Sequence, residues 1–392
     1  MADARGTLAG WLRLTLVPGI GGRTQRKLLT AFGLPDVIFS AGYGALRAVI
    51  GDKAARRLLD TDNTAAIAAA LAWAQAPGRY IVTLADSAYP RALLEISDPP
   101  TLLYVIGQVE WLNQTILSVV GSRMPTPQGI LNAEQFARAL AETGLVIASG
   151  MALGIDTAAH RGALAAHGKT IAFVGTGIDR VYPAGNRELA HEIGAKGVIV
   201  SEFPLGTPAT ASNFPRRNRL ISGVARGVLI VEATVESGSL ITARLAGEQG
   251  REVFAIPGSI HSPQARGCHR LIKEGAKLVE TAQDILEELH WSTPIPTPTP
   301  TPDQAPVPDQ APVSPTPTPA LSGTGSADMD GREKILSLMG YDPCALDELT
   351  VRSGLSADAL SVHLLHLELE GRVASLPGGR YQQVKNGPET GG

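Results

Sequence analysis

Short apolar runs and longer amphipathic stretches alternate along the chain from about Thr101 to Glu280. The apolar runs are rich in valine and isoleucine and end in glycine or small polar residues, as in ILSVVG, LVIASG, TIAFVGTG and GVLIVEA. The stretches between them have helical spacing, as in QGILNAEQFARALAET and GSLITARLAGEQG. Strand, glycine-rich turn and helix in repeated succession predict a doubly wound, mostly parallel α/β sheet whose strands are covered on both faces.

The segments on either side of this pattern predict further domains. An alanine-rich helical pattern predicts a helical domain over residues 1–77, followed by the sheet domain over 78–290. Alternating prolines predict an extended linker over 291–330, since they favour polyproline II and cannot build a core. Residues 331–386 show three helical stretches and then RVASLPGGRYQQV, a predicted β-hairpin, and this order is typical of a winged-helix domain.

One stretch of the helical segment, LVPGIGGRTQRKLLTAFG, joins an apolar helix end to a second amphipathic helix through a Gly-Ile-Gly turn. It resembles a helix-hairpin-helix unit of the SAM-like type, whose turn amides can hold a phosphate. A tight turn between packed helices explains the same residues without a ligand, so both interpretations stay open.

Composition narrows the functional classes. The 392 residues carry a formal net charge of −3 at pH 7, so affinity for a polyanion must come from a local patch. Two cysteines are too few for a disulfide framework and indicate a reducing compartment. The first residues lack the pattern of a signal peptide, and no apolar run reaches the ~18 residues that a membrane helix needs. We therefore expect a cytoplasmic protein without a membrane partner.

Ligands of doubly wound sheets bind outside the carboxyl ends of the strands, so the loops after the predicted strands are the place to look for a site. Four of these loops are rich in glycine and small polar residues: 121–123, 149–156, 175–179 and 236–239. Glycine lets a backbone approach a ligand, and free amides at a helix N-terminus bind anions. Each loop alone could merely turn the chain, but the four together predict an anion-binding groove.

The segment SNFPRRNRLISG adds cations where a helix is predicted to begin. A helix N-terminus carries the positive end of the macrodipole, so arginines at this place imply a neighbouring anion. Arg216 and Arg217 are candidates to bind that anion. Arg219 could do the same, or it could pair with an acid such as Glu202 or Glu232 and brace the site.

Other residues of these loops allow two interpretations each. Arg123, directly after a predicted strand, is either a surface arginine or, with Arg217, a direct contact to the anion. Phe214 is either a hydrophobic staple at the helix entry or a platform for base stacking. Asp156 and His160 could form an acid–base pair on one helical turn. Alternatively, Asp156 caps its helix and His160 belongs to a polar network.

Catalytic motifs are weak in this sequence. ALAAHGKT approximates a P-loop, but a predicted helix precedes it and a strand follows, the reverse of the order that lets helix amides hold phosphates. GTGIDR lacks the third glycine of a dinucleotide fingerprint. The histidines and cysteines show no metal-ligand spacing, and no nucleophile–base pair is evident. We expect no enzymatic activity, no cofactor and no metal.

Taken together, the motifs resemble those of the DNA processing protein A (DprA/Smf) family over nearly the whole chain. The similarity is strongest in VGSR, SGMALGIDTAAHRGAL, VGTGIDRVYPAGN, SEFPLGTPATASNFPRRNRLISG, VEATVESGSLITARLAGEQGREVFAIPGS and GCHRLIKEGAKLV. One departure is His269, where the family commonly has asparagine, and this puts in doubt any polar role assigned to the position.

The resemblance implies an extended Rossmann-like domain that binds single-stranded DNA without sequence preference. It also implies protection of incoming strands, loading of the RecA recombinase in natural transformation and recombination, and a homodimer formed through this domain. Carried over by position, the family's arginine after the first core strand is Arg123, its FPxRNR element begins at Phe214, and two loops supply backbone contacts. The candidate DNA-binding residues are Arg123, Ser149, Gly150, Phe214, Arg216, Arg217, Asn218, Arg219, Ser237, Gly238 and Ser239.

Two further functions stay open. A nucleotide-processing enzyme of the phosphoribohydrolase type has similar strand ends, but its PGGxGTxxE element is absent and VESGSLITA stands in its place. The third possibility is an interaction module that anchors a nucleoprotein assembly through the winged helix. The second hairpin helix of that fold usually enters the major groove. Here it carries His363, His366, Glu368 and Glu370, with no lysine or arginine before Arg372, so we expect weak duplex binding or a protein contact.

Overall fold

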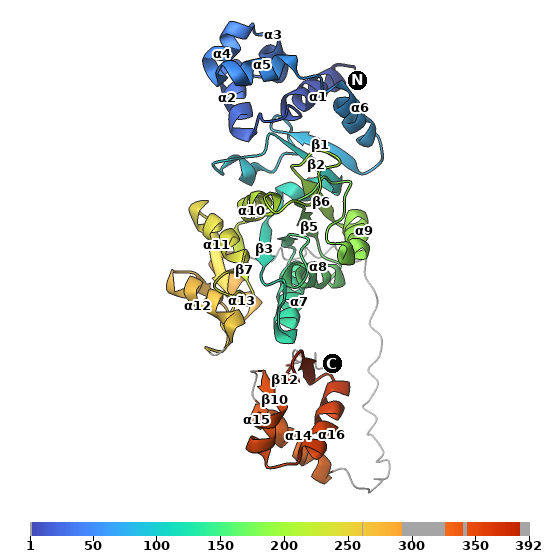
Figure 1. Cartoon of the computed structure of the whole chain (residues 1–392), viewed down its shortest axis with the longest axis vertical. Helices are drawn as coiled ribbons and strands as arrows, with labels where there is room; N and C mark the ends of the chain where they lie inside the picture. Colours follow the sequence, from blue (N-terminus) through green and yellow to red (C-terminus); the bar gives the residue numbers. More distant parts are fainter. Residues whose placement is uncertain (1, 261, 292–325, 340–342, 385–392) are drawn as a thin grey trace, which may run out of the picture. The chain divides into compact units, whose positions relative to one another are not determined.

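The computed structural model describes residues 2–260, 262–291, 326–339 and 343–384 (Figure 1). The chain divides into two compact units, residues 1–291 and 292–392, and each is described by itself. The linker predicted over residues 291–330 lies mostly outside the described residues. In the part of the chain that the structure does describe, no helix combines the length and the apolar character needed to cross a membrane.

The first unit begins with a group of helices whose apolar faces meet in a small core of Leu14, Leu28, Ile38, Leu46 and Leu58. The first and the last of these helices also pack on the sheet. Trp11 and Leu12 of the first and Ala70 of the last share a core with strand residues. The helices are α1 (Ala2–Thr15), α2 (Gly22–Phe32), α3 (Pro35–Ser40), α4 (Tyr43–Ile50), α5 (Asp52–Asp60) and α6 (Thr64–Trp73).

The described residues form a nine-stranded sheet in the order β1-β2-β6-β5-β4-β3-β7-β8-β9. All neighbours from β6 to β9 are parallel, whereas β2 is antiparallel to β6 and to β1. This arrangement confirms the predicted doubly wound, mostly parallel sheet. The strands are β1 (Arg79–Thr83), β2 (Leu102–Gly107), β3 (Ile116–Val120), β4 (Val146–Ser149), β5 (Thr170–Phe173), β6 (Val198–Ser201), β7 (Gly227–Ile230), β8 (Glu252–Ala255) and β9 (Lys277–Leu278).

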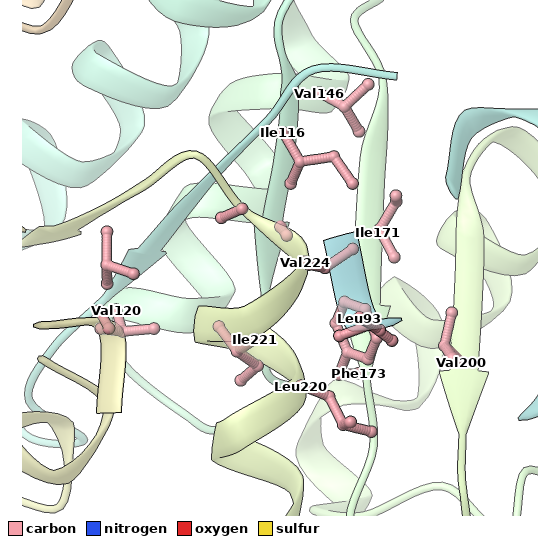
Figure 2. Close-up of a cluster of buried hydrophobic side chains, with 14 of the residues drawn as sticks. Leu93, Ile116, Val120, Val146, Ile171, Phe173, Val200, Leu220, Ile221 and Val224 are labelled. Atoms are coloured by element: carbon pink, nitrogen blue, oxygen red, sulfur yellow. The ribbon is translucent and has the colours of Figure 1, made fainter. Parts of the chain in front are cut away.

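Helices cover both faces of this sheet, because successive strand residues point to opposite sides. Ile116 and Phe173 face α10, which packs on them through Leu220 and Ile221 (Figure 2). Leu117 faces the opposite layer, in which α7 and α8 pack together. Each such apolar side chain contributes about 1.5–3 kcal/mol on burial, so α10 is held firmly against the sheet.

The remaining elements of this unit connect the strands. At ALAAHGKT a helix ends and a strand begins, which is the predicted order and the reverse of the order in a P-loop. The helices are α7 (Pro127–Glu142), α8 (Ile155–Ala165), α9 (Arg187–Lys196), α10 (Asn213–Val224), α11 (Ser239–Glu248), α12 (Arg266–Lys273) and α13 (Ala282–Glu288). The 3-10 turns are η1 (Arg91–Leu94), η2 (Val109–Asn113), η3 (Ala184–Asn186) and η4 (Pro263–Ala265).

The second unit is a winged helix, as predicted. Its hairpin turns at Gly378 and Gly379, whose φ angles of 84° and 67° suit glycine. Leu349, Leu360 and Leu364 form its core with neighbouring apolar residues. The elements are α14 (Ser326–Met339), β10 (Cys344–Ala345), α15 (Leu346–Ser353), α16 (Ala357–Leu369), β11 (Val373–Leu376) and β12 (Arg380–Gln383).

Candidate nucleic-acid interface

A cavity of about 210 Å³, here called the rim pocket, lies where β3, β4 and β5 end. The loops after these three strands supply most of its walls, and the first turns of α10 supply the rest. Its lining consists of Arg123, Met124, Met151, Ala152, Leu153, Gly175, Tyr182, Pro183, Phe214 and Arg217. The structure thus brings Arg123, Phe214 and Arg217 to one cavity at the carboxyl rim of the sheet.

Two aromatic rings and a cation form one wall of the rim pocket. The rings of Tyr182 and Phe214 have centroids 5.6 Å apart and planes inclined by 38°. The guanidinium carbon of Arg123 lies 5.5 Å from the centre of the Phe214 ring. Gly175 makes room for that ring, since a Cβ atom there would lie only 2.9 Å from it. Aromatic rings with a neighbouring cation are typical of sites for single-stranded nucleic acid.

Arg217 forms the floor of the rim pocket rather than an exposed contact. Only 4% of the residue is exposed, and its Nη1 donates a hydrogen bond to the Phe173 carbonyl oxygen at 2.5 Å. Its Nε donates to Oδ1 of Asn218 at 3.2 Å, so Asn218 holds the guanidinium in place. A side chain at Gly150 would overlap both Arg217 and Asp156, which approach each other over this glycine.

The charges beneath the pocket are unequal. Burial raises the pKa of the Asp156 carboxyl, while the nearby guanidiniums of Arg217 and Arg123 act against that shift. Two cations therefore face one carboxyl group, and the pocket carries excess positive charge whether Asp156 is ionised or protonated. Such a site favours an anion at its mouth.

His160 supports the loop from below. Its Nε2 lies 2.6 Å from the Gly150 carbonyl oxygen and its Nδ1 lies 2.7 Å from Oγ1 of Thr170. Burial lowers the pKa of His160 to about 4, so the imidazole is neutral at pH 7. Of the two interpretations of this residue, the structure supports the polar network. Asp156 accepts from the Ala152 amide at 3.3 Å, ahead of α8, and so it does not cap that helix.

Ser149 also lies below the pocket and does not reach its lining. The residue is fully buried, and its hydroxyl donates to the Val119 carbonyl oxygen at 2.6 Å. This bond ties β4 to β3. Ser149 therefore positions the glycine loop, and its predicted contact with DNA stays a prediction.

The crevice at the topological switch point, between β3 and β7, is closed. The Ser122 amide donates to the Glu232 carbonyl oxygen at 2.7 Å, across the two strand ends. The Glu232 carboxylate accepts from the Thr126 amide at 2.9 Å and from the Thr126 hydroxyl at 2.5 Å. It thereby occupies the N-terminus of α7, where an external anion could otherwise bind. The space for a ligand lies instead toward β4 and β5.

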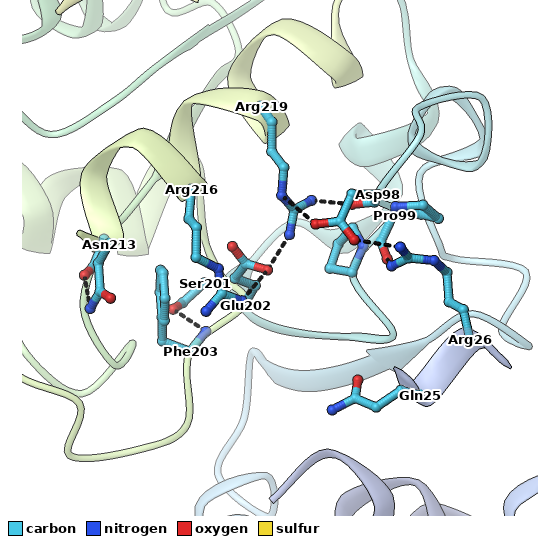
Figure 3. A network of polar contacts seen from close by, with 12 residues as sticks. Gln25, Arg26, Asp98, Pro99, Ser201, Glu202, Phe203, Asn213, Arg216 and Arg219 are labelled. Atoms are coloured by element: carbon cyan, nitrogen blue, oxygen red, sulfur yellow. Dashed lines mark hydrogen bonds and ion pairs between the residues drawn. The ribbon is translucent and has the colours of Figure 1, made fainter. Parts of the chain in front are cut away.

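The guanidinium of Arg219 forms ion pairs with two carboxylates (Figure 3). Its guanidinium bonds to buried Glu202 and to Asp98, whose Oδ2 lies 3.3 Å from Nε. Arg26 of α2 binds the same Asp98 from the other side. Of the two predicted alternatives the structure thus shows the brace, with Glu202 as the partner, whereas Glu232 serves Thr126.

The arginines of α10 are divided between two cavities. Arg217 lines the rim pocket, whereas Arg216 and Arg219 line a second cavity of about 480 Å³ beside the Gly-Ile-Gly turn. Exposed Arg216 lies over the Phe203 ring at 5.2 Å, with Nη2 3.3 Å from Glu202. Arg216 and Arg219, which the sequence offered beside Arg217 as candidates to bind the anion, therefore do not line the rim pocket. The reason is that Arg216 and Arg219 are three residues apart and lie on one side of α10, whereas Arg217 points to Phe173 of the sheet.

The loop before α11 lies in a third place. Ser237 lines a cavity of about 580 Å³ between α11 and α12, and its Oγ lies 2.7 Å from that of Ser239. Neither Gly238 nor Ser239 lines the rim pocket. The predicted DNA contacts of these residues stay predictions. His269 does make a polar contact, with Nε2 2.9 Å from the Gly258 carbonyl oxygen.

Tyr182 is an aromatic residue of the pocket to which the sequence analysis assigned no role. The sequence contained a signal for it, an aromatic residue in a loop after a predicted strand. Within the described residues, no group of three histidine, cysteine, aspartate or glutamate side chains is placed to hold a metal ion. The polar chemistry at the rim is that of guanidinium groups and backbone amides.

Comparison with known proteins identifies relatives of this chain. Residues 80–290 match the family model described as DNA recombination-mediator protein A, and residues 292–379 match that of the DprA winged helix domain. The protein Smf of Synechocystis sp. is 35% identical, over 96% of this chain and 98% of its own length. The DNA processing protein DprA of Streptococcus pneumoniae is 48% identical over 209 residues, which cover 53% of this chain and 74% of that protein. The X-ray structure of DprA from Streptococcus pneumoniae matches with a TM-score of 0.65 and 39% identity, and covers 71% of this chain and 97% of that chain.

Proposed function

The chain belongs to the DNA processing protein A (DprA/Smf) family, and on this premise we propose that it binds single-stranded DNA at the rim pocket, without sequence preference. The observation that carries the proposal is the guanidinium of Arg123 over the ring of Phe214, beside Tyr182. Every base has an aromatic face, so stacking on these rings contributes about 1–3 kcal/mol per base whatever the sequence.

The residues of the rim pocket have different roles in binding a single strand. A base enters the cavity and stacks against Phe214, whose ring is half-buried and so held in place. Exposed Arg123 neutralises a phosphate beside that base. Buried Arg217 adds a fixed positive charge beneath the pocket and keeps the strand-end loops together. Because phosphate contacts release counterions, binding weakens with salt by a slope near −0.7 per phosphate on single strands.

The wider role follows from the family. We assign to the chain the protection of incoming single strands and the loading of the RecA recombinase, as a cytoplasmic homodimer. The description of the matching family model, DNA recombination-mediator protein A, supports this role. The protein acts by binding and not by catalysis, because the titratable groups under the pocket have structural tasks. His160 is neutral with both ring nitrogens engaged, and Asp156 balances the charge of two arginines.

The proposal is tested by titrating the full chain into fluorescein-labelled oligo-dT, mixed-sequence single strands and a duplex of equal length, over a series of NaCl concentrations. We expect the single strands to bind alike, and more tightly than the duplex. Equal affinity for single strands and duplex, with no salt dependence, would refute the proposal. Incubation with nucleoside monophosphates, in which we expect no release of base, tests the alternative of a phosphoribohydrolase.

A further inference from the structure

Helix α16 of the winged-helix unit has two apolar faces. Leu360, Leu364 and Leu367 are fully buried in the core of the unit. On the outer face, Val362, Leu365 and Leu369 are 54%, 56% and 77% exposed. Their spacing of three and four residues places them in one stripe along the helix, here called the α16 stripe. Single exposed apolar residues are common, but three in line on one helix mark an interaction surface.

The surroundings of the α16 stripe do not suit DNA. Residues 357–369 contain no lysine or arginine, and residues 343–384 carry five carboxylates against three arginines. Two of these arginines are tied to carboxylates of their own unit, Arg352 to Glu348 and Arg372 to Glu333. Affinity for DNA comes mainly from cations that neutralise phosphates. The helix that normally reads the major groove therefore presents a surface for protein.

We propose that the α16 stripe is a self-association surface, which packs against the α16 stripe of a second copy of this chain with the two helices antiparallel. About the midpoint between Leu365 and His366, Val362 and Leu369 exchange places, and Leu365 lies half a residue from the centre. Two antiparallel copies therefore set Val362 of one helix opposite Leu369 of the other, while the two Leu365 side chains meet near the two-fold axis. A two-fold contact requires this self-complementarity.

Charged residues at the ends of the helix favour the same arrangement. Asp358 lies one turn before Val362 on the same face, seven residues before Leu365, and it is exposed. Arg372 follows the end of the helix, seven residues after Leu365. The antiparallel pairing brings Asp358 of one copy toward Arg372 of the other, where it adds to the pairs that Arg372 makes with Glu333 and Glu370 of its own unit. A parallel pairing would instead bring like charges together at each end.

The small size of the stripe points to a tethered partner. Stable interfaces bury about 800 Å² per partner, more than three apolar side chains supply. The proline-rich segment joins the winged helix to the sheet unit. If two sheet units pair in the homodimer of the proposed function, on which this step rests, the two winged helices are tethered to one assembly, and this raises the effective concentration at which they meet. A weak contact is then sufficient to hold the winged helix of a second, tethered copy, but it would not hold a protein that is free in solution.

The test is cysteine cross-linking in the full chain. Leu365→Cys places a thiol at the two-fold axis, and Val351→Cys, on the neighbouring helix α15 and 84% exposed, is the matched control. Both native cysteines are buried. With a short bismaleimide, we expect at least five times more covalent dimer for Leu365→Cys than for Val351→Cys. Adding Val362→Asp and Leu369→Asp to Leu365→Cys is expected to reduce the yield to that of the control.

Equal yields from Leu365→Cys and Val351→Cys would overturn the inference and assign the stripe to another protein. Oligo-dT binding, measured on the same samples, separates this result from failure of the proposed function. Normal binding with equal yields contradicts self-association alone. A high yield from Leu365→Cys without DNA binding supports self-association and contradicts the rim pocket alone.

Discussion

The guanidinium carbon of Arg123 lies 5.5 Å from the centre of the Phe214 ring, although the two residues are 91 positions apart in the chain. The strand-end loop after β3 and the first turn of α10 meet here because both lie at the carboxyl rim of the parallel sheet. Their meeting places a cation and an aromatic face side by side. The cation and the ring contribute to binding separately from each other and from the residues that hold the site in place.

Arg123→Ala removes an exposed cation from the rim pocket. We expect a loss of about 1–2 kcal/mol in the free energy of binding, roughly 5- to 30-fold in affinity, that is equal for all single-stranded sequences. The salt slope should fall by about 0.7, because one phosphate contact is lost. Fluorescence anisotropy over a salt series measures both. Arg138→Ala, which removes an exposed arginine of α7 paired with Glu142, is the control and should change neither.

Phe214→Leu removes the aromatic face and retains an apolar side chain at the start of α10. The expected loss is about 1–3 kcal/mol in binding free energy, with the salt slope unchanged since no phosphate contact is lost. Tyr182→Leu should weaken binding in the same way. If Phe214→Leu binds oligo-dT like the parent chain, the ring is only a staple for the helix.

Arg219→Ala tests the brace of Arg219 with Glu202. It leaves the Glu202 carboxylate buried without its main partner, so the free energy of unfolding should fall by about 3–5 kcal/mol. Denaturant unfolding measures that loss, and binding per folded molecule should keep its salt slope. Unchanged stability together with a slope reduced by about 0.7 would place Arg219 on the DNA instead.

Gly150→Ala tests the close approach of Arg217 and Asp156 over the loop. The added Cβ atom overlaps both side chains, so we expect lower stability and weaker DNA binding together. Gly247→Ala is the control, because it lies inside α11 with free space around its Cβ position. That change should stabilise the chain by about 0.5–1 kcal/mol, as alanine does in a helix. Thermal unfolding measures the stability of both variants, and titration with oligo-dT measures their affinity for DNA.

The buried imidazole of His160 predicts a dependence of stability on pH. Its pKa in the folded chain, about 4, lies below the ordinary value of 6.5, so the unfolded chain binds the additional proton first. The stabilising contribution is complete above pH 6.5 and is lost as the pH falls toward 4, by roughly 3 kcal/mol in all. Denaturant unfolding at several pH values should show this slope. His160→Gln should flatten it between pH 6.5 and 4, and an unchanged slope in that variant contradicts the assignment.

The sequence predicted the sheet well because its strands are buried on both faces. Such strands leave unbroken valine and isoleucine runs, and the Gly121 and Gly150 loops that follow them come to one rim in any parallel sheet. The inward position of Arg217 was also readable, since it lies three and four residues before Leu220 and Ile221, on the apolar face of α10. Arg216 and Arg219 lie off that face and could not be assigned in this way.

Other features required the tertiary structure. The partners of Arg219 come from the end of β6 and from the segment before β2. The sequence offered Glu202 as one candidate, but no local pattern separated it from Glu232 or pointed to Asp98. Closure of the crevice between β3 and β7 likewise depends on Glu232 reaching the start of α7. Pairing choices of this kind are set by packing between distant segments, which sequence spacing does not record.

The central claim, that a single strand stacks its base on the aromatic wall of the rim pocket, is tested most directly by photo-cross-linking. Oligo-dT that carries one 5-iodouracil is irradiated with the full chain, and the cross-linked peptide is identified by mass spectrometry. We predict attachment at Phe214 or Tyr182, and its loss in Arg123→Ala in proportion to the loss of binding. Cross-links confined to α16 or to residues 236–239, with none in the rim pocket, would contradict the account.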